Sequence, residues 1–200
     1  MSQRNASDNY SSLIYALVLG GLFGYVQPWI VVPSGSMTLN VFDLAEWASL
    51  IPTQQVTSPP LLVPLLLRLQ PVILSLLLGV IASGRKRMAL TALAICLLAT
   101  AQLPPFEFVN DINNLNYRQQ FILAAASLVA GFFLLPLESR RVSTFVMLAL
   151  PAVGIVTAAL GLSEAGALYR QFQLDAAPGA GIWILGLSYV ATITISLRGL

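Results

Sequence analysis

Long apolar runs alternate with short polar segments along the whole chain. A helix needs about 20 residues to cross the ~30 Å hydrocarbon core of a bilayer, and several of the runs reach or approach that length. The predicted spans cover residues 13–32, 60–83, 88–103, 119–137, 142–162 and 181–197. The pattern therefore predicts an all-α, polytopic integral membrane bundle of six helices. We expect a single domain over residues 13–200, preceded by a short polar segment at residues 1–12.

The charges between these runs predict an orientation. Seven basic residues fall on the side of the N-terminus: Arg4, Arg85, Lys86, Arg87, Arg140, Arg141 and Arg198. The gaps on the opposite side hold only Arg118 and Arg170. Because basic loops stay in the cytoplasm, we expect both termini to be cytoplasmic. Arginine supplies nine of the ten basic residues, which favours a bacterial source and hence the inner membrane.

Composition supports a lipid environment and removes several functional classes. The chain is 57% hydrophobic and 9% charged, whereas soluble domains carry about 25% charged residues. The net charge of +2 is small and the basic residues are scattered, so we expect no nucleic-acid partner. The chain has no histidine, the commonest metal ligand, and its single cysteine, Cys96, permits no intrachain disulfide. We expect no metal and no cofactor.

The longest gap between spans contains a short amphipathic segment. Its apolar positions fall at helical spacing on one face: Val41, Leu44, Ala48 and Ile51. Asn40 can cap the helix, and Asp43 and Glu46 lie near its start, where negative charge suits the helix dipole. We predict a helix lying at the outer membrane interface, with Trp47 as its anchor. The alternative is docking onto a partner subunit through Asp43, Glu46 and Trp47.

Arg68 is the one ionisable residue inside a predicted span. A charge at the centre of a bilayer costs about 2.5–3.5 kcal/mol on insertion scales, so such residues are candidates for function. Arg68 lies about one helical turn below the outer surface. It can therefore extend to the headgroups or pair with an outer carboxylate, with Asp43, Glu46 and Glu107 as possible partners. A contact with a substrate or a subunit is the alternative.

Small residues four positions apart recur in three of the spans. The pairs are Gly20 with Gly24, Ala126 with Ala130, and Gly154 with Ala158. Small residues at this spacing let helix backbones approach closely. We expect these residues to pack helices together, within this chain or against another.

One short motif resembles a catalytic box. The run Val32-Pro33-Ser34-Gly35-Ser36-Met37 resembles the nucleophile box of type I signal peptidases, which implies Ser36 as the nucleophile and a lysine as its base. The chain departs from that family at Leu39, where the family has proline. Its only lysine, Lys86, lies in a gap on the opposite side of the predicted membrane. We therefore expect no enzyme activity, and a turn at residues 33–36 that ends the first helix.

A second resemblance concerns transport. The run Pro178-Gly179-Ala180-Gly181-Ile182-Trp183 is similar to a segment in the N-terminal membrane regions of bacterial osmoprotectant ABC permeases. The resemblance covers a glycine turn that enters a helix, and it implies no site residues.

These observations favour a non-catalytic membrane protein. The best hypothesis is an accessory or structural subunit of a larger bacterial inner-membrane complex, with lipid and other membrane subunits as partners. The alternative is an autonomous transporter or channel for small solutes or lipid, related to an ABC-type permease. Transport would require polar groups within the spans, and the sequence offers few: Ser75, Thr91, Ser127, Thr157, Ser188 and Thr192.

Overall fold

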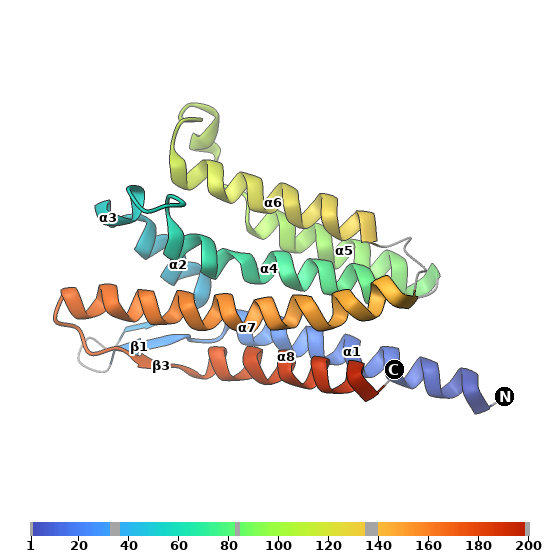
Figure 1. Ribbon diagram of the computed structural model, residues 1–200. Coiled ribbons are helices and arrows are strands. Elements are labelled where there is room, and N and C mark those ends of the chain that lie inside the picture. The colour runs from blue at the N-terminus through green and yellow to red at the C-terminus, as the bar shows by residue number, and fades with distance from the viewer. Residues whose placement is uncertain (1, 33–36, 83–84, 135–139, 199–200) are drawn as a thin grey trace.

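The computed structural model describes the backbone of residues 2–32, 37–82, 85–134 and 140–198, and side chains over 12–32, 37–82, 88–134 and 144–198. The chain is mostly helical (Figure 1). The long helices are α1 (Ser2–Val26), α4 (Leu62–Ile81), α5 (Arg85–Ala101), α6 (Leu115–Leu134), α7 (Arg140–Gln171) and α8 (Ala180–Arg198). The short elements are α2 (Val41–Ser49), α3 (Pro52–Gln55), the 3-10 helix η2 (Phe106–Val109), β1 (Ile30–Val32), β2 (Met37–Leu39) and β3 (Ala177–Pro178).

Helix α4 lies at the centre of the bundle. It packs against α1, α5, α6 and α7, and α8 closes the assembly by packing on α1 and α7. Both termini lie at one end of the long helices in Figure 1, and the strands, α2 and α3 lie at the other. We call these the terminal end and the sheet end. α4 is buried on nearly all sides because its sequence is apolar all round, as expected of a helix surrounded by others.

Four helices in the described part of the chain are long and apolar enough to cross a membrane. They are Leu62–Ile81, Leu115–Leu134, Thr144–Gln171 and Ala180–Arg198. Two shorter apolar helices, Ser12–Val26 and Met88–Ala101, accompany them. The helical fold class is thereby confirmed, and four helices of this length and composition are consistent with a membrane protein.

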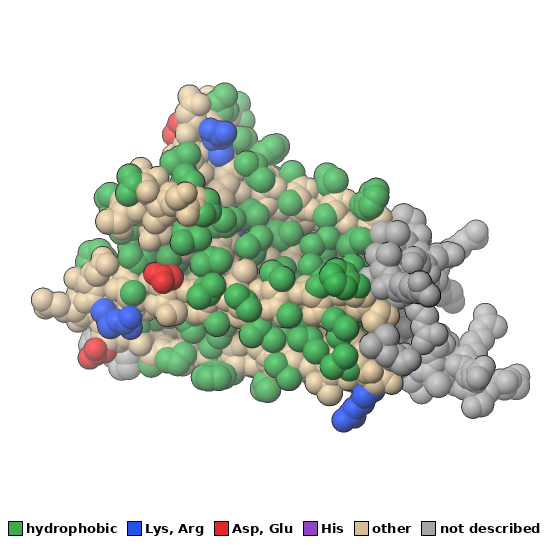
Figure 2. All heavy atoms as spheres, viewed as in Figure 1, with side chains coloured by type: hydrophobic (Ala, Val, Ile, Leu, Met, Phe, Trp, Pro, Cys, Tyr) green, Lys and Arg blue, Asp and Glu red, His purple; other side chains and the backbone are tan. Residues whose placement is uncertain are grey.

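The outward faces of the long helices are apolar. On α5 the exposed leucines are spaced like one helical face, at Leu90, Leu93 and Leu97, and α7 and α8 expose Phe145, Trp183 and Leu187. Figure 2 shows apolar side chains across the visible face, with charged side chains toward its two ends. Continuous apolar cover of this extent suits hydrocarbon better than water.

Two predicted boundaries are wrong. The first span was predicted to continue to residue 32, but α1 ends at Val26 because Pro28 disfavours a helical conformation in the residue before it. Ile30–Val32 form β1 instead. The fifth span was predicted to end at residue 162, but α7 continues to Gln171. Ala165, Leu168 and Tyr169 are buried and extend the same inward stripe, so packing sustains the helix beyond the apolar run.

A three-stranded antiparallel sheet closes the sheet end. β1 pairs with β2, with Val32 opposite Met37, and β3 pairs with the other edge of β1. The predicted turn at residues 33–36 lies outside the described residues. Trp29 is fully buried beside the sheet, where its indole nitrogen donates to the carbonyl oxygen of Gly24 at 3.0 Å. The sheet therefore ties the end of α1 to the segment that leads into α8.

Candidate functional site

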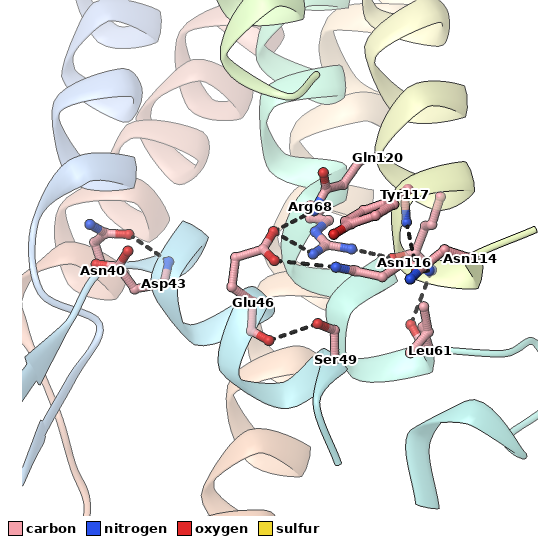
Figure 3. Close-up of polar contacts among 11 residues, drawn as sticks. Asn40, Asp43, Glu46, Ser49, Leu61, Arg68, Asn114, Asn116, Tyr117 and Gln120 are labelled. Carbon is pink, nitrogen blue, oxygen red and sulfur yellow. Dashed lines mark hydrogen bonds and ion pairs between the residues drawn. The ribbon is translucent and has the colours of Figure 1, made fainter. Parts of the chain in front are cut away.

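Arg68 of α4 is the most deeply buried charged residue that the described side chains contain. Its side chain is 3% exposed, and Nη2 lies 2.7 Å from Oε1 of Glu46. Nη1 donates to Oε1 of Gln119 at 3.0 Å. Of the three carboxylates that the sequence offered as partners, the structure selects Glu46. Arg68 thus forms an ion pair inside the bundle, close to the sheet end (Figure 3).

Helix α2 brings Glu46 to this position. The Asn40 side chain caps the helix by accepting from the backbone nitrogen of Asp43 at 3.0 Å, as the sequence predicted. The apolar face of α2, which includes Val41, Leu44 and Ala48, is fully buried, mainly against α4. With that face turned inward, Glu46 reaches Arg68, whereas Asp43 is exposed.

Trp47 lies on the other flank of α2. Its ring stacks on Tyr169 with centroids 4.2 Å apart and meets Phe172 edge-on at 5.8 Å. Tyr169 lies in the last turn of α7, and Phe172 directly follows the helix. Both lie in the gap between the predicted spans 142–162 and 181–197. The aromatic contact and the buried apolar face hold α2 against its own chain. Its placement at a membrane interface stays a prediction.

Amide side chains from α6 complete the surroundings of the ion pair. Gln120 donates to Oε1 of Glu46, and Asn116 donates to Oε2 at 3.3 Å. Gln119 also donates to the carbonyl oxygen of Leu61 at 3.2 Å. Sequence reasoning missed these amides. Their signal was present, because positions 116, 119 and 120 have the spacing of one helical face.

Two polar atoms of this cluster have no partner among the described residues: Nε of Arg68 and Oδ1 of Asn116. A groove of about 490 Å³ lies beside the cluster, toward the sheet end. Its lining is rich in polar side chains. The complete lining is Ser49, Leu50, Gln55, Leu61, Asn113, Asn114, Leu115, Asn116 and Tyr117. The arrangement offers hydrogen-bonding groups, with no pair of nucleophile and base among those residues.

A second polar contact joins α4, α7 and α8 in the interior. Gln70 is fully buried, and its Nε2 donates to Oγ1 of Thr157 at 2.9 Å. The hydroxyl of Tyr189 donates to Oε1 of Gln70 at 3.0 Å. Sequence reasoning noted Thr157 and missed Gln70, although a glutamine within an apolar run is itself the signal. Each group satisfies another, so the contact fixes helices together.

Of the three pairs of small residues predicted to pack helices, two contain glycines that lie at close approaches between helices. A Cβ atom at Gly24 would lie 2.7 Å from the backbone nitrogen of Leu185, and one at Gly20 would lie 3.3 Å from Oγ of Ser188. At Gly154 a Cβ would lie 2.5 Å from Cε2 of Tyr189. Ala158, on the same helix, is buried. These residues join α1 to α8 and α7 to α8.

The third pair lies elsewhere on its helix. Ala126 and Ala130 are half-buried, beside the stripe of α6 that faces the bundle. That stripe contains Gly131, and a Cβ at Gly79 of α4 would lie 2.5 Å from its carbonyl oxygen. The close approach of α4 and α6 therefore uses two glycines that the spacing rule did not select.

The described part of the chain holds no group of three or more histidine, cysteine, aspartate or glutamate residues able to bind a metal. Ser36, the serine of the peptidase-like box, and the side chain of Lys86 lie outside the described residues.

Comparison with protein-family models, with curated proteins and with solved structures gives no match for this chain. Its function therefore has to be argued from the geometry of its own residues.

Proposed function

We propose that the chain is a non-catalytic, six-span integral protein of a bacterial inner membrane, with both termini in the cytoplasm, and that it serves as an accessory or structural subunit of a larger complex. One observation carries the proposal. The strongest polar groups inside the bundle hydrogen-bond across helices, as Arg68 does with Glu46 and Gln70 with Thr157 and Tyr189. They hold the helices in place.

The two shorter helices fit a six-span arrangement. α1 has 25 residues and α5 has 17. Their apolar parts, Ser12–Val26 and Met88–Ala101, are shorter than the about 20 residues of a typical span, so the six-span arrangement requires the polar first turns of both helices to lie in the headgroup region. With six passes the termini would share one side of the membrane, which fits their position at the terminal end in Figure 1. The seven basic residues counted above then lie in the cytoplasm.

A solute pathway is disfavoured by the way α4 is packed. Selective transport requires polar groups that line a shared passage through the bilayer. Gln70, near the middle of α4, is fully buried and is bonded to α7 and α8. The 490 Å³ groove with its polar lining is formed by α2, α3, the start of α6 and the residues just before it, at the sheet end.

The sheet end also offers a surface for a partner. Its short connections expose large apolar side chains, with Phe106 at 94%, Val56 at 83% and Leu50 at 77%. Large apolar side chains exposed among polar loops are typical of protein contact sites. We therefore place the partner subunit at this end of the bundle, on the outer side of the membrane.

Gentle solubilisation of the native membrane tests the proposal. We expect tagged protein to leave the membrane with companions in a fixed ratio, measured by native mass spectrometry. Phe106→Ser combined with Val109→Ser should release them, because apolar residues at the centre of an interface carry most of its energy. Leu187→Ser, on the exposed face of α8, is the matched control and should retain them. A monodisperse single chain in several mild detergents would contradict the subunit role.

The alternative function, a transporter or channel, is favoured for lipid by one feature. This feature is an apolar crevice lined by α1, α2, α4 and α5. A protein that handles lipid would require such a crevice open to the bilayer.

A further inference from the structure

The side of the bundle between α1 and α5 is hollowed to a crevice of about 210 Å³. Both helices pack against α4, and Pro71 of α4 is among the residues of its wall. The full lining is Tyr25, Val26, Asn40, Phe42, Pro71, Leu98, Ala101 and Gln102. Apart from Pro71, these residues come from the last turn of α1, the start of α2, and the end of α5 with the residue that follows it. The crevice therefore lies near the sheet end, at the depth where these two helices finish.

The crevice is lined mainly by apolar groups, and several of them are exposed. Val26 is 59% exposed, Phe42 is 37% exposed, and Ala101 is also exposed. Leu90, Leu93 and Leu97 continue this apolar surface along α5. In a bilayer such a hollow faces acyl chains, and filling it with lipid restores the dispersion contacts that an empty space would lose.

The wall of the crevice also carries neutral polar groups. Gln102 is 5% exposed, and its Nε2 donates to the carbonyl oxygen of Leu98 at 3.1 Å and to Oγ of Ser127 at 2.8 Å. Its Oε1 is buried and has no partner among the described residues. A buried carbonyl oxygen without a donor is unfavourable, so a ligand hydroxyl that reached it would be stabilised.

Asn40 supplies a donor on another wall. The Asn40 oxygen accepts from the backbone of Asp43, which leaves its amide nitrogen to donate toward a ligand. No lysine or arginine lines the crevice, so a phosphate group would find no cation there.

We propose that this crevice binds an uncharged glycerolipid with a free hydroxyl, of the diacylglycerol class. The hydroxyl donates to Oε1 of Gln102, and an ester carbonyl accepts from the amide nitrogen of Asn40. The acyl chains leave along Val26 and Leu98 into the bilayer. Because α1 and α5 end here, the polar groups lie at the depth of a lipid's glycerol backbone. The inference rests on the six-span placement proposed above and is independent of membership in a complex.

Native mass spectrometry of the purified chain tests the proposal. Delipidated protein is offered 1,2-dioleoylglycerol or dioleoylphosphatidylcholine at equal mole fraction. We expect about tenfold more of the diacylglycerol adduct, the difference that one well-placed hydrogen bond supplies. Ala101→Trp fills the crevice with an indole ring and should remove this preference. Ala152→Trp, at an exposed position of α7, is the matched control and should keep it.

A change in the ligand separates the hydroxyl contact from the shape of the crevice. The 3-methyl ether of the same diacylglycerol lacks the hydroxyl donor and should bind about tenfold more weakly to the unaltered chain. This comparison decides the question even if Ala101→Trp does not fold. Equal retention of all three lipids, or equal behaviour of the two tryptophan variants, would overturn the proposal. Since the isolated chain is used, neither outcome depends on partner subunits.

Discussion

At the scale of single residues, the two partners of the Arg68–Glu46 ion pair differ in their exposure to solvent. Arg68 is 3% exposed, whereas the Glu46 side chain is 35% exposed. Loss of the ion pair therefore costs more free energy at the arginine than at the glutamate, because water cannot solvate an unpaired guanidinium in the interior. The amides of Asn116 and Gln120 neutralise no charge, but they hold the carboxylate in place.

Removing the carboxylate should therefore destabilise the fold. We expect Glu46→Gln to lower the free energy of unfolding by about 3 kcal/mol, the lower end for a broken buried pair, because Glu46 is partly exposed. Thermal unfolding in detergent micelles measures the change. Glu107→Gln, at an exposed position of η2, is the control and should change little. Glu46→Gln combined with Arg68→Met should recover much of the loss, and no recovery would show that the pair is not the cause.

The Gln70 contact allows a double-mutant cycle. Tyr189→Phe removes the hydroxyl that donates to Gln70, and Gln70→Leu removes the amide. We expect each change to cost about 1 kcal/mol, because interhelical hydrogen bonds in membrane proteins are modest. The double variant should cost less than the sum of the two, as measured by unfolding in mixed micelles. Strict additivity would mean that the two groups do not interact.

Sequence reasoning succeeded at some residues and failed at others for a physical reason. Arg68 was identified because its charge is anomalous in its own span. Its carboxylate could not be chosen, because Glu46 and Gln119 lie 22 and 51 positions away and meet only when α2 and α6 pack on α4. Local pattern carries no information about such contacts.

At the scale of elements, the helices follow from their apolar runs and the strands do not. Strands of two or three residues are too short to show alternation, so the sheet could not be predicted. The last turns of α7 look like a loop because Glu164 and Arg170 interrupt the apolar run. The helix persists there because its inward residues, such as Tyr169, pack against α2.

Contact between α1 and α8 gives a prediction at this scale. We expect Gly24→Ala to destabilise the bundle by about 1–3 kcal/mol, because its Cβ would collide with the backbone of α8 at Leu185. Gly186→Ala is the matched control, since no atom lies within 4 Å of its Cβ position. That change should be neutral or stabilise by up to about 1 kcal/mol through helix propensity. The same loss in both variants would count against the close approach.

At the scale of the whole molecule, burial and charge are arranged in different directions. Buried residues are concentrated around α4, and the helices around it expose their outer faces. Charged side chains lie toward the ends of the long helices, and the surface between the ends is apolar (Figure 2). The first arrangement makes a core, and the second leaves an apolar region between the charged ends. Composition and hydrophobic pattern were enough to predict the second arrangement, because it is an average over many residues. The central position of α4 depends on contacts between helices and was not predicted.

Cysteine labelling tests the proposed orientation. In a Cys96→Ala background, Gln55→Cys places a thiol on the exposed part of α3 at the sheet end, and Ser7→Cys places one near the N-terminus. An impermeant maleimide should label position 55 in intact spheroplasts and position 7 only after lysis, because basic segments stay inside. Labelling of position 7 in intact cells would reverse the orientation, and labelling of both would remove the membrane placement.

The pairing of β1 with β3 has a consequence for how the protein is made. α1 emerges from the ribosome long before its partner, since Ala180 follows Val26 by 154 positions. Until α8 has been synthesised, the glycine face of α1 has no neighbour and one edge of β1 is open. In the nascent chain, α1 therefore exists without its partner until synthesis is nearly finished, and the contact between the two distant segments completes late in assembly.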